Sequence, residues 1–274
     1  MKPSGITRRL AAASAAILIL ATTAGVPAQA ADQAEYKPNL YQAGKDVVWV
    51  PTPGDLVEKM LDMAKLTPAD TLLDLGSGDG RTVIAAAKRG ATASGIEYNP
   101  DMVALSKREA QKAGLAATAT FVEADIFKSD LTKATVISLF LLPELNLRLR
   151  PTILTLKPGT RIVSNTFKMG DWNPDEAADL KCGPHCIAYL WIVPARVEGR
   201  WNSSLGPLAI TQTFQTFEGA IGGKPTEQGR IVGERILFSA EGSEFSGVVR
   251  GDGMQGTFKS ATGVSGEWKA TRIP

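Results

Sequence analysis

The stretch Asp74-Leu75-Gly76-Ser77-Gly78-Asp79-Gly80 decides the fold that this sequence predicts. It follows an apolar run at 71–75 that is typical of a buried strand, and it precedes a segment at 81–89 with helical character. A glycine loop in this position is typical of a cofactor cradle, because glycine has no Cβ and lets the backbone approach a ligand closely. The first two glycines are therefore expected to face the cofactor, and the third opens the helix.

Strands and helices alternate along the chain on both sides of this loop. Further strands are expected at 92–96, 119–122, 135–141 and 160–167, and helices at 54–66, from Pro100 to Gly114 and, interrupted at Pro151, between the last two strands. Such alternation calls for a parallel sheet that is covered by helices on both faces. The predicted fold class is therefore α/β, with a Rossmann-like, doubly wound sheet.

Acidic residues follow the next two predicted strands. Glu97 ends the strand at 92–96, and a carboxylate there can accept hydrogen bonds from both ribose hydroxyls of a nucleoside. Asp125 follows the strand at 119–122, where it can accept from an adenine amino group while Ile126 packs against the base. Together with the glycine loop, these residues predict a site for a cofactor that contains adenosine.

The cofactor that suits these residues best is S-adenosylmethionine, with NAD as the alternative. The NAD fingerprint is Gly-x-Gly-x-x-Gly, and here the third glycine comes one residue early. Pyrophosphate also needs an unobstructed helix N-terminus, whereas Asp79 places a negative charge in the loop. S-adenosylmethionine has no phosphates and carries a sulfonium cation, so an acidic loop is compatible with it.

Several segments resemble the class I S-adenosylmethionine-dependent methyltransferases. They are Asp74–Gly80 with Arg81, Ile84, Ala85 and Ala86, then Gly95–Asn99, and Ala124–Ile126. More narrowly, Trp49–Pro53 and Phe140–Asn146 resemble seven-strand protein-lysine methyltransferases, whose mitochondrial members modify the ATP synthase c-subunit and the adenine nucleotide translocase. Pro143-Glu144 and Gly159–Ser164 are distantly similar to the non-SET histone lysine methyltransferases. The resemblance covers about residues 47–173 and implies this cofactor and a lysine amine as the methyl acceptor.

The predicted site combines these motifs with the resemblance. The residues expected to bind the cofactor are Thr52, Asp74, Gly76, Ser77, Gly78, Gly80, Glu97, Asp125 and Ile126, where Thr52 follows from the resemblance alone. The segment Leu139–Leu142 is expected to line an apolar channel that lowers the pKa of the acceptor amine by desolvation. Glu144 is the predicted catalytic residue, which orients the amine or takes its proton through water. Alternatively, Glu144 only begins the next helix, where a carboxylate interacts favourably with the helix dipole.

Residues 1–30 are expected to form a signal peptide. Its basic start, apolar run and cleavage site are Lys2, Arg8 and Arg9, then Leu10 to about Ala24, then Ala28-Gln29-Ala30 before Ala31. The apolar run is too short for a comfortable membrane span. An exported protein, periplasmic or secreted, is therefore expected, and an uncleaved membrane anchor is the alternative. Thr7-Arg8-Arg9 also resembles a twin-arginine signal, which would export the protein in its folded form.

Composition argues against nucleic acid as a partner. Removal of residues 1–30 leaves 27 basic and 28 acidic residues, so the mature chain is nearly neutral. A protein that binds DNA or RNA needs a basic surface to neutralise the phosphates. Nucleic acid is therefore disfavoured as the acceptor. A protein lysine, which the resemblance implies, or a small molecule is expected instead, and no stable membrane span is expected once the signal peptide is cleaved.

The single histidine and both cysteines lie within the short segment Cys182–Cys186. In an oxidising compartment, a disulfide that closes this segment is the expected arrangement. Metal capture by Cys182, His185 and Cys186 is a minor alternative. These three are all the histidine and cysteine residues of the chain, so no other part of it can supply several such ligands for zinc. No metal site is therefore predicted.

The sequence changes character near Pro194, after which strands and turns alternate without a helical period. Strands are expected at 197–201, 208–217, 231–238, 245–250, 256–259 and 266–270. We therefore expect a methyltransferase domain at 31–194 and a small antiparallel β domain at 195–274. The mitochondrial proteins that the chain resembles are intracellular and have no obvious counterpart of this second domain, so the acceptor, the role of the β domain and the oligomeric state stay open.

The expected function is methyl transfer from S-adenosylmethionine to a protein lysine amine. One alternative is a small-molecule or lipid methyltransferase. Another is a non-catalytic exported binding protein that retains the fold, because S-adenosylmethionine is made in the cytosol and its supply outside the inner membrane is not evident. An intact glycine loop together with Glu97 and Asp125 argues against a decayed site.

Overall fold

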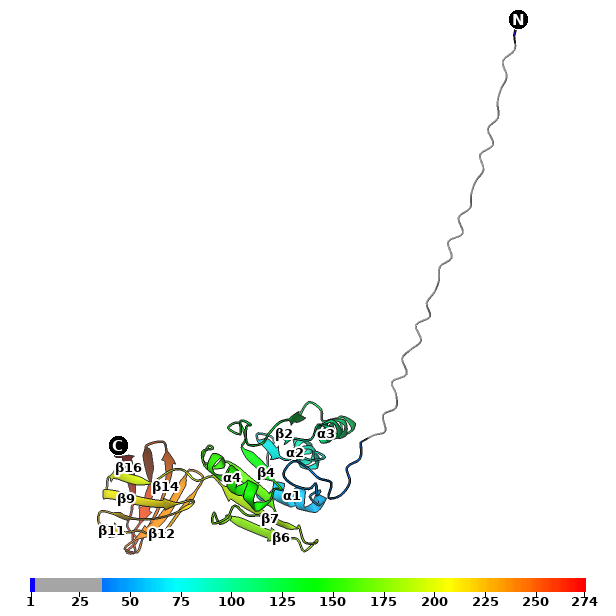
Figure 1. The fold of residues 1–274 in the computed structure, drawn as a ribbon. Coiled ribbons are helices and arrows are strands. Elements are labelled where there is room, and N and C mark those ends of the chain that lie inside the picture. Colours follow the sequence, from blue (N-terminus) through cyan, green and yellow to red (C-terminus); the bar gives the residue numbers. More distant parts are fainter. Residues whose placement is uncertain (3–35) are drawn as a thin grey trace. The chain divides into compact units, whose positions relative to one another are not determined.

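The computed structural model describes residues 1–2 and 36–274 (Figure 1). The predicted signal peptide, apart from its first two residues, and the cleavage site before Ala31 lie outside the described residues. Among the described residues, no helix is both long enough and apolar enough to cross a membrane.

The first sheet has seven strands in the order β3-β2-β1-β4-β5-β7-β6. Its strands are β1 (Thr71–Leu75), β2 (Thr92–Glu97), β3 (Ala119–Glu123), β4 (Val136–Leu139), β5 (Arg161–Asn165), β6 (Glu176–Asp179) and β7 (Ile187–Ile192). The pairs among β1 to β5 are parallel, whereas β7 runs antiparallel to both β5 and β6. This topology confirms the predicted doubly wound α/β sheet, with an antiparallel hairpin that the sequence analysis did not predict.

Four helices belong to this part of the chain: α1 (Gly54–Met63), α2 (Arg81–Lys88), α3 (Pro100–Lys112) and α4 (Pro143–Ile153). Asn99 caps α3 by accepting from the backbone N–H groups of Asp101 and Met102, with Pro100 at the first helical position. The predicted interruption at Pro151 is wrong. Because α4 ends two residues after this proline, the missing N–H weakens only the last turn.

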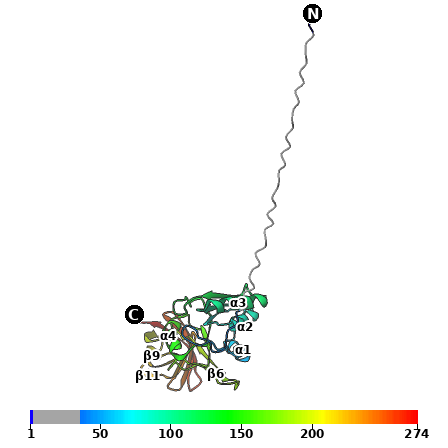
Figure 2. The same ribbon diagram turned by 45° about the vertical axis from the view of Figure 1, so that its right-hand side comes forward.

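The sheet buries both of its faces. Leu72 packs on one face with Leu56 of α1 and Ala86 of α2, whereas Leu75 belongs to a second cluster with Leu149 of α4. The helices α2 and α3 are neighbours in both views (Figures 1 and 2). The parallel strands are therefore enclosed, and their polar residues concentrate at the strand ends.

The rest of the chain forms a nine-stranded antiparallel sheet. Its strands are β8 (Gly199–Ser203), β9 (Gly206–Thr213), β10 (Thr216–Ile221), β11 (Lys224–Pro225), β12 (Glu227–Val232), β13 (Arg235–Ala240), β14 (Ser243–Arg250), β15 (Gly253–Lys259) and β16 (Ser265–Arg272). An additional pairing between β9 and β10 closes it into a barrel. The predicted β domain is confirmed as a fold.

Two of the predicted barrel strands are wrong, because each is a hairpin. The expected strand at 208–217 turns at Phe214, which has a left-handed φ of +52°. The expected strand at 231–238 turns at Gly233, whose φ is +59°. The first turn was not predicted because Phe214 is apolar, whereas turns are recognised in a sequence by residues such as glycine, proline, asparagine and aspartate.

Polar and aromatic contacts connect the first sheet's surroundings to the barrel. The Arg230 guanidinium lies 2.6 Å from the Asp175 carboxylate. Trp172 and Phe214 stack with their ring centroids 5.9 Å apart. The domain boundary at 194 stays a prediction, although the strands of the first sheet end at Ile192 and those of the barrel begin at Gly199.

Candidate active site

A pocket opens at the carboxyl ends of β1, β2 and β4. It is lined by most of the residues predicted from the sequence, namely Thr52, Asp74, Gly76, Ser77, Gly78, Glu97, Asp125 and Ile126. Gly80 and Glu144 are not among its lining residues. The glycine loop and the acidic strand ends, which are far apart in sequence, therefore meet in one place, as open α/β sheets require.

The glycine loop is held open by backbone hydrogen bonds and by left-handed residues. The N–H groups of Gly76 and Ser77 donate to the Ile96 carbonyl at 2.8 and 3.0 Å. Gly78 has a φ of +53°, and a Cβ there would lie 2.8 Å from Nε1 of Trp49. A side chain at this position would therefore displace the tryptophan, so only glycine keeps this wall of the pocket in place.

Gly80 has a structural reason to be glycine. It caps α2 with a φ of +80°, and a Cβ there would lie 2.7 Å from the ring of Phe121 and 2.9 Å from Cβ of Ser106. Close packing between α2, α3 and β3 thus accounts for this residue. Its predicted contact with the cofactor stays a prediction.

Glu97 is fixed by three backbone donors. One carboxylate oxygen accepts from the N–H of Gly78 at 2.9 Å, and the other accepts from Tyr98 and Asn99 at 2.9 and 3.0 Å. A carboxylate offers about four lone-pair sites, so the oxygen that accepts only from Gly78 can still accept a hydroxyl. The predicted contact to the ribose is therefore compatible with the geometry.

Asp74 lines the pocket and is buried, with 6% of its surface exposed. Burial raises the pKa of Asp74 to about 7, although Ser138 donates a hydrogen bond to the carboxylate, and the charges of Glu97 and Asp79 raise the pKa further. Beside it, Ser77 Oγ is buried and has no hydrogen-bond partner among the described residues. A desolvated carboxylate and an unpaired hydroxyl are suited to a ligand that brings a cation and a hydrogen-bonding group.

Asp125 is connected to the arm, which is the segment at 42–52 that precedes α1. Its carboxylate accepts from the N–H of Phe127 at 2.9 Å and lies 3.1 Å from Lys45 Nζ. These two contacts hold the pKa of Asp125 below its usual range. Lys45 also lies 4.4 Å from the ring centroid of Tyr98, so one arm residue contacts two strand ends.

The arm is folded back on itself and forms a wall of the pocket, since residues 42–52 all line it. The N–H of Tyr41 donates to the Trp49 carbonyl, and that of Trp49 donates to the Gln42 carbonyl, both at 2.9 Å. Lys45 and Trp49 were therefore missed as site residues. Their short polar and proline-rich context carries no periodic signal, and their partners lie far away in sequence.

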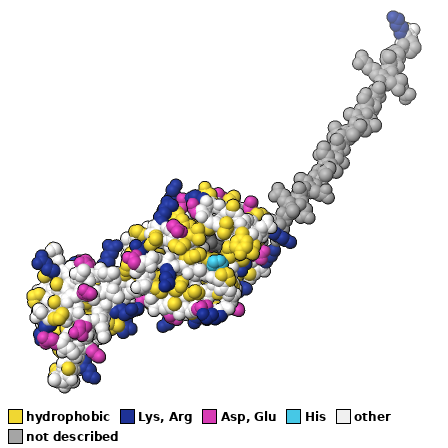
Figure 3. Space-filling view, turned by 60° about the horizontal axis from the view of Figure 1, so that its bottom comes forward, with side chains coloured by type: hydrophobic (Ala, Val, Ile, Leu, Met, Phe, Trp, Pro, Cys, Tyr) yellow, Lys and Arg dark blue, Asp and Glu magenta, His cyan; other side chains and the backbone are white. Residues whose placement is uncertain are grey.

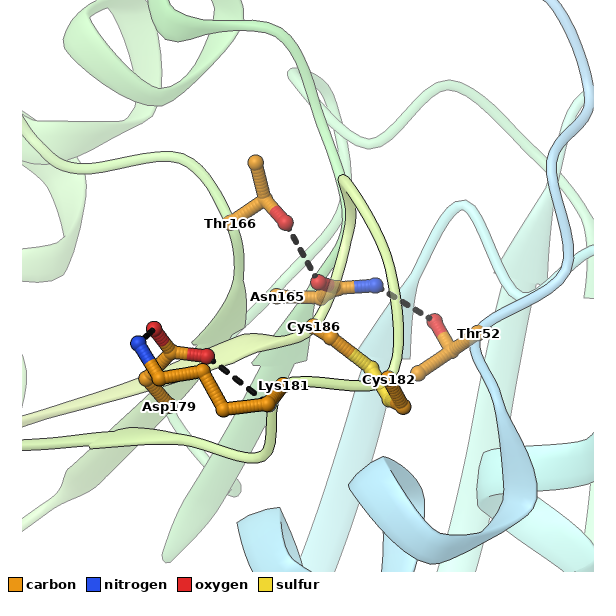
Figure 4. The surroundings of a disulfide bond; sticks show 7 residues. All are labelled: Thr52, Asn165, Thr166, Asp179, Lys181, Cys182 and Cys186. Carbon is orange, nitrogen blue, oxygen red and sulfur yellow. Dashed lines mark hydrogen bonds and ion pairs between the residues drawn. A yellow bond between two sulfur atoms is a disulfide. The ribbon is translucent and has the colours of Figure 1, made fainter.

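Thr52 joins the arm to the sheet. Its hydroxyl accepts from the Asn165 side chain at 3.4 Å, and its carbonyl accepts from Arg81 at 2.9 Å. Figure 4 shows Thr52 and Asn165 in the surroundings of the disulfide between Cys182 and Cys186. The predicted disulfide is thus confirmed, and its loop belongs to the neighbourhood of the pocket.

Glu144 is exposed on the first turn of α4. The neighbouring residues Phe140, Leu141 and Leu145 line the pocket instead. Of the segment that the sequence predicts as an apolar channel, Leu139, Phe140 and Leu141 line the pocket, whereas Leu142 is exposed. Leu145 was not predicted and joins them in an apolar wall at the end of β4. The catalytic role of Glu144 stays a prediction.

A trio of aromatic rings borders this apolar wall. The ring centroid of Phe140 lies 6.0 Å from that of Phe167 and 5.7 Å from that of His185. Phe167 and His185 are 6.2 Å apart. The histidine, cyan in Figure 3, is surrounded by hydrophobic side chains on this face. His185 was considered from the sequence only for metal capture, and its partners Phe140 and Phe167 are not sequence neighbours.

Comparisons with known proteins agree with this geometry. The model of the ANTKMT methyltransferase domain family matches residues 74–176. A protein-lysine N-methyltransferase of Saccharolobus islandicus is 38% identical over 152 residues, which cover 54% of this chain and 94% of the relative. The adenine nucleotide translocase lysine N-methyltransferase of Mus musculus is 36% identical over 120 residues, or 43% of this chain. The chain spans only about half of that mouse protein, 52% of its length.

Among solved structures, an RNA methyltransferase from Salinibacter ruber in complex with S-adenosylhomocysteine is 44% identical, with a TM-score of 0.52. The match covers 54% of this chain and 96% of that structure. S-adenosylhomocysteine is the product that S-adenosylmethionine leaves after methyl transfer, and the glycine loop, Asp74 and Glu97 are suited to that cofactor. With a relative matched over nearly its whole length, the chain belongs to the class I S-adenosylmethionine-dependent methyltransferases, in the family of the protein-lysine N-methyltransferases.

Proposed function

We propose that this protein transfers a methyl group from S-adenosylmethionine to the side-chain amine of a lysine in a protein substrate. The observation that carries the proposal is the apolar wall of Phe140, Leu141 and Leu145, which continues the cofactor pocket at the end of β4. The lysine methyltransferase named among the relatives supports the same acceptor. An apolar entrance favours an uncharged amine over a charged or strongly hydrated acceptor.

Each cofactor group has a matching residue in the pocket. When bound, S-adenosylmethionine supplies an electrophilic methyl group on a sulfonium. We expect Glu97, which lines the pocket, to accept from the ribose hydroxyls, and Asp125 to accept from the adenine amino group. Asp74, in its ionised form, would stabilise the positive charge of the methionine part. These roles position the methyl group and need no chemistry from the side chains.

The acceptor amine must lose a proton before it can attack. A lysine has an ordinary pKa of about 10.4, and the ammonium has no lone pair. Desolvation against the apolar wall lowers that pKa and increases the fraction of free amine. Binding the amine in line with the bond to be broken then accounts for much of the rate.

RNA is the competing acceptor, because the Salinibacter ruber relative is named an RNA methyltransferase. The charge of this chain argues against it, with 30 basic and 28 acidic residues over its whole length. Small-molecule or lipid methylation, and a non-catalytic binding role, are the remaining alternatives.

The experiment uses radiolabelled S-adenosylmethionine with an extract of the cells that make the protein. Label in methyl-lysine after acid hydrolysis of the protein fraction is the expected result. Label that is released by ribonuclease, or that stays in organic-soluble small molecules, would contradict the lysine proposal. Gly78→Val serves as the inactive control, because its side chain would collide with the indole of Trp49 in the pocket wall.

We also propose that the protein acts outside the cytosol. The disulfide between Cys182 and Cys186 supports this location, because disulfides persist in oxidising compartments. The expected native N-terminus is Ala31, in a periplasmic or secreted protein. Intact-mass measurement of native material, with and without reduction and alkylation, tests both features. A chain that begins at Met1 would indicate a membrane anchor or a cytosolic enzyme. Two freely alkylated thiols would reject the disulfide and remove its support for this location.

A further inference from the structure

The loop Cys182–Cys186 brings the only histidine of the chain to the apolar wall of the pocket. The loop connects β6 to β7 and is closed by its disulfide, with the two Cα atoms 5.6 Å apart. His185 contacts the ring of Phe140, which itself lines the cofactor pocket. The imidazole does not itself line the pocket, but it contacts a ring that does.

The imidazole has an unusual polar environment. Its Nδ1 atom is buried and has no hydrogen-bond partner among the described residues. The neighbouring rings of Phe140 and Phe167 offer no conventional partner. Buried polar atoms are nearly always paired, and an unpaired one at a site needs an explanation. A phenylalanine would pack against these rings equally well, so packing alone does not explain the nitrogen.

We propose that His185 is a catalytic residue whose Nδ1 accepts the proton of the acceptor lysine. This inference rests on the proposed lysine methylation and adds a residue to it. The Cys182–Cys186 disulfide is the positioning element, because it fixes the loop that presents the imidazole to Phe140 and Phe167. The three rings would enclose the aliphatic part of the lysine.

Proton and methyl transfer balance in this step. The neutral imidazole takes one proton from the lysine ammonium, which leaves a free amine and an imidazolium. The amine nitrogen then forms a bond to the methyl carbon while the sulfur–carbon bond breaks. The electron pair of the broken bond stays on sulfur. The product is a methylated ammonium, and the imidazolium returns its proton to solvent. Imidazole is suited to this role because histidine is the side chain that most often serves as a general base.

A direct test is possible because the chain contains a single histidine. Protein labelled with ¹⁵N-histidine and prepared without a histidine tag gives one imidazole signal pair. With the enzyme saturated by S-adenosylhomocysteine, n-butylamine should shift the Nδ1 resonance. Butyltrimethylammonium has the same chain and charge but no N–H, so it should not. An Nδ1 resonance that responds to neither compound, or equally to both, would overturn the proposal.

Turnover on the labelled extract gives the second test. His185→Phe keeps an aromatic ring and removes the nitrogen, so kcat should fall by about 10²-fold while the dissociation constant for S-adenosylmethionine stays unchanged. His185→Ala should show a similar loss and recover part of it when imidazole is added. Methyl-lysine formed by His185→Phe at the wild-type rate would overturn this inference alone. Label that never reaches lysine in the wild type would instead overturn the proposed function.

Reduction of the disulfide tests the positioning role. A mild phosphine reductant should lower kcat of the wild type without changing cofactor affinity, and reoxidation should restore it. The double variant Cys182→Ser, Cys186→Ser should behave like the reduced enzyme. The same reductant should have no further effect on His185→Phe, because the nitrogen that the loop positions is already gone. Equal sensitivity of both proteins would show that the disulfide does not act through His185.

Discussion

Gly78 adopts a left-handed backbone directly beside the indole of Trp49, with a φ of +53° and 2.8 Å from its virtual Cβ to Nε1. Gly78→Ala should therefore push Trp49 out of the pocket wall. We expect the dissociation constant for S-adenosylmethionine to rise at least about tenfold, which corresponds to about 1.4 kcal/mol. Calorimetric titration measures this change.

Gly114→Ala is a matched control for Gly78→Ala. Gly114 also has a left-handed φ, +72°, but a Cβ there would meet nothing within 4 Å, and it does not line the pocket. The control should lose about 1 kcal/mol of stability through backbone strain and keep its cofactor affinity. If both variants lost affinity equally, the effect would come from backbone strain and not from the pocket.

Asp74 predicts that cofactor binding depends on pH. Burial raises its pKa to about 7, so below that pH the carboxyl group is mostly protonated in the protein without cofactor. A positively charged cofactor favours the ionised form, and a proton must leave on binding. Affinity should therefore rise about tenfold per pH unit up to about pH 7 and level off above it. Asp74→Asn should abolish the slope, and a wild type with pH-independent affinity would contradict the assignment.

The residues that the sequence predicted are those with local signals. The glycine loop and Glu97 each follow a strand directly, so their place at the strand ends could be inferred from the strand pattern alone. Lys45 and His185 are recognised as site residues only through their contacts with Asp125 and Phe140, which lie far away in sequence. No periodicity or spacing encodes such contacts.

At the scale of elements, the arm at 42–52 should respond to the cofactor, because the whole segment lines the pocket. Contacts between the cofactor and the arm should reduce local opening of the hairpin between Tyr41 and Trp49. Amide hydrogen exchange should therefore slow in this segment when S-adenosylhomocysteine is added. Amides of the barrel strand β14 serve as the control and should not change. Unchanged exchange in the arm would mean that it does not close over the cofactor.

The first turn of α4 allows the two roles of Glu144 to be separated. Glu144→Gln should lower turnover by about 10²–10⁴-fold if the residue handles the amine. If it only interacts with the helix dipole, about 0.3–1 kcal/mol of stability should be lost with turnover intact. Asp101→Asn is the matched control, because Asp101 also follows a proline at the first helical position, in α3, and does not line the pocket. Turnover and thermal unfolding of both variants decide the question.

Elements with one strong local pattern were predicted well, and hairpins were not. The apolar run of β1 was predicted with its observed bounds, Thr71–Leu75. The edge strand β6 has the sequence Glu-Ala-Ala-Asp, with mostly exposed residues and no apolar alternation. Such a strand exists because β7 pairs with it, which is a tertiary cause that propensity does not report.

At the scale of the whole molecule, we expect two unfolding transitions in calorimetry. The barrel has its own core around residues such as Trp201, Phe238 and Trp268, separate from the clusters on the two faces of the first sheet. When the cofactor is present at a hundred times its dissociation constant, the midpoint temperature of the methyltransferase domain should rise by roughly 5–10 °C, and that of the barrel should stay unchanged. A single transition that shifts as a whole would reject the predicted division at residue 194.

Closure of the barrel also limits how copies of this protein can associate. Because β9 pairs with β10, the barrel offers no long unpaired strand to which another chain could add. Among the described strands, the open edges belong to β3 and β6 of the first sheet and to the two-residue strand β11. The outer strand β6 is short and carries Glu176 and Asp179, whose charges repel a second copy. Aggregation by strand addition, when the protein is concentrated or partly unfolded, should therefore begin at β3, where Val122 is exposed.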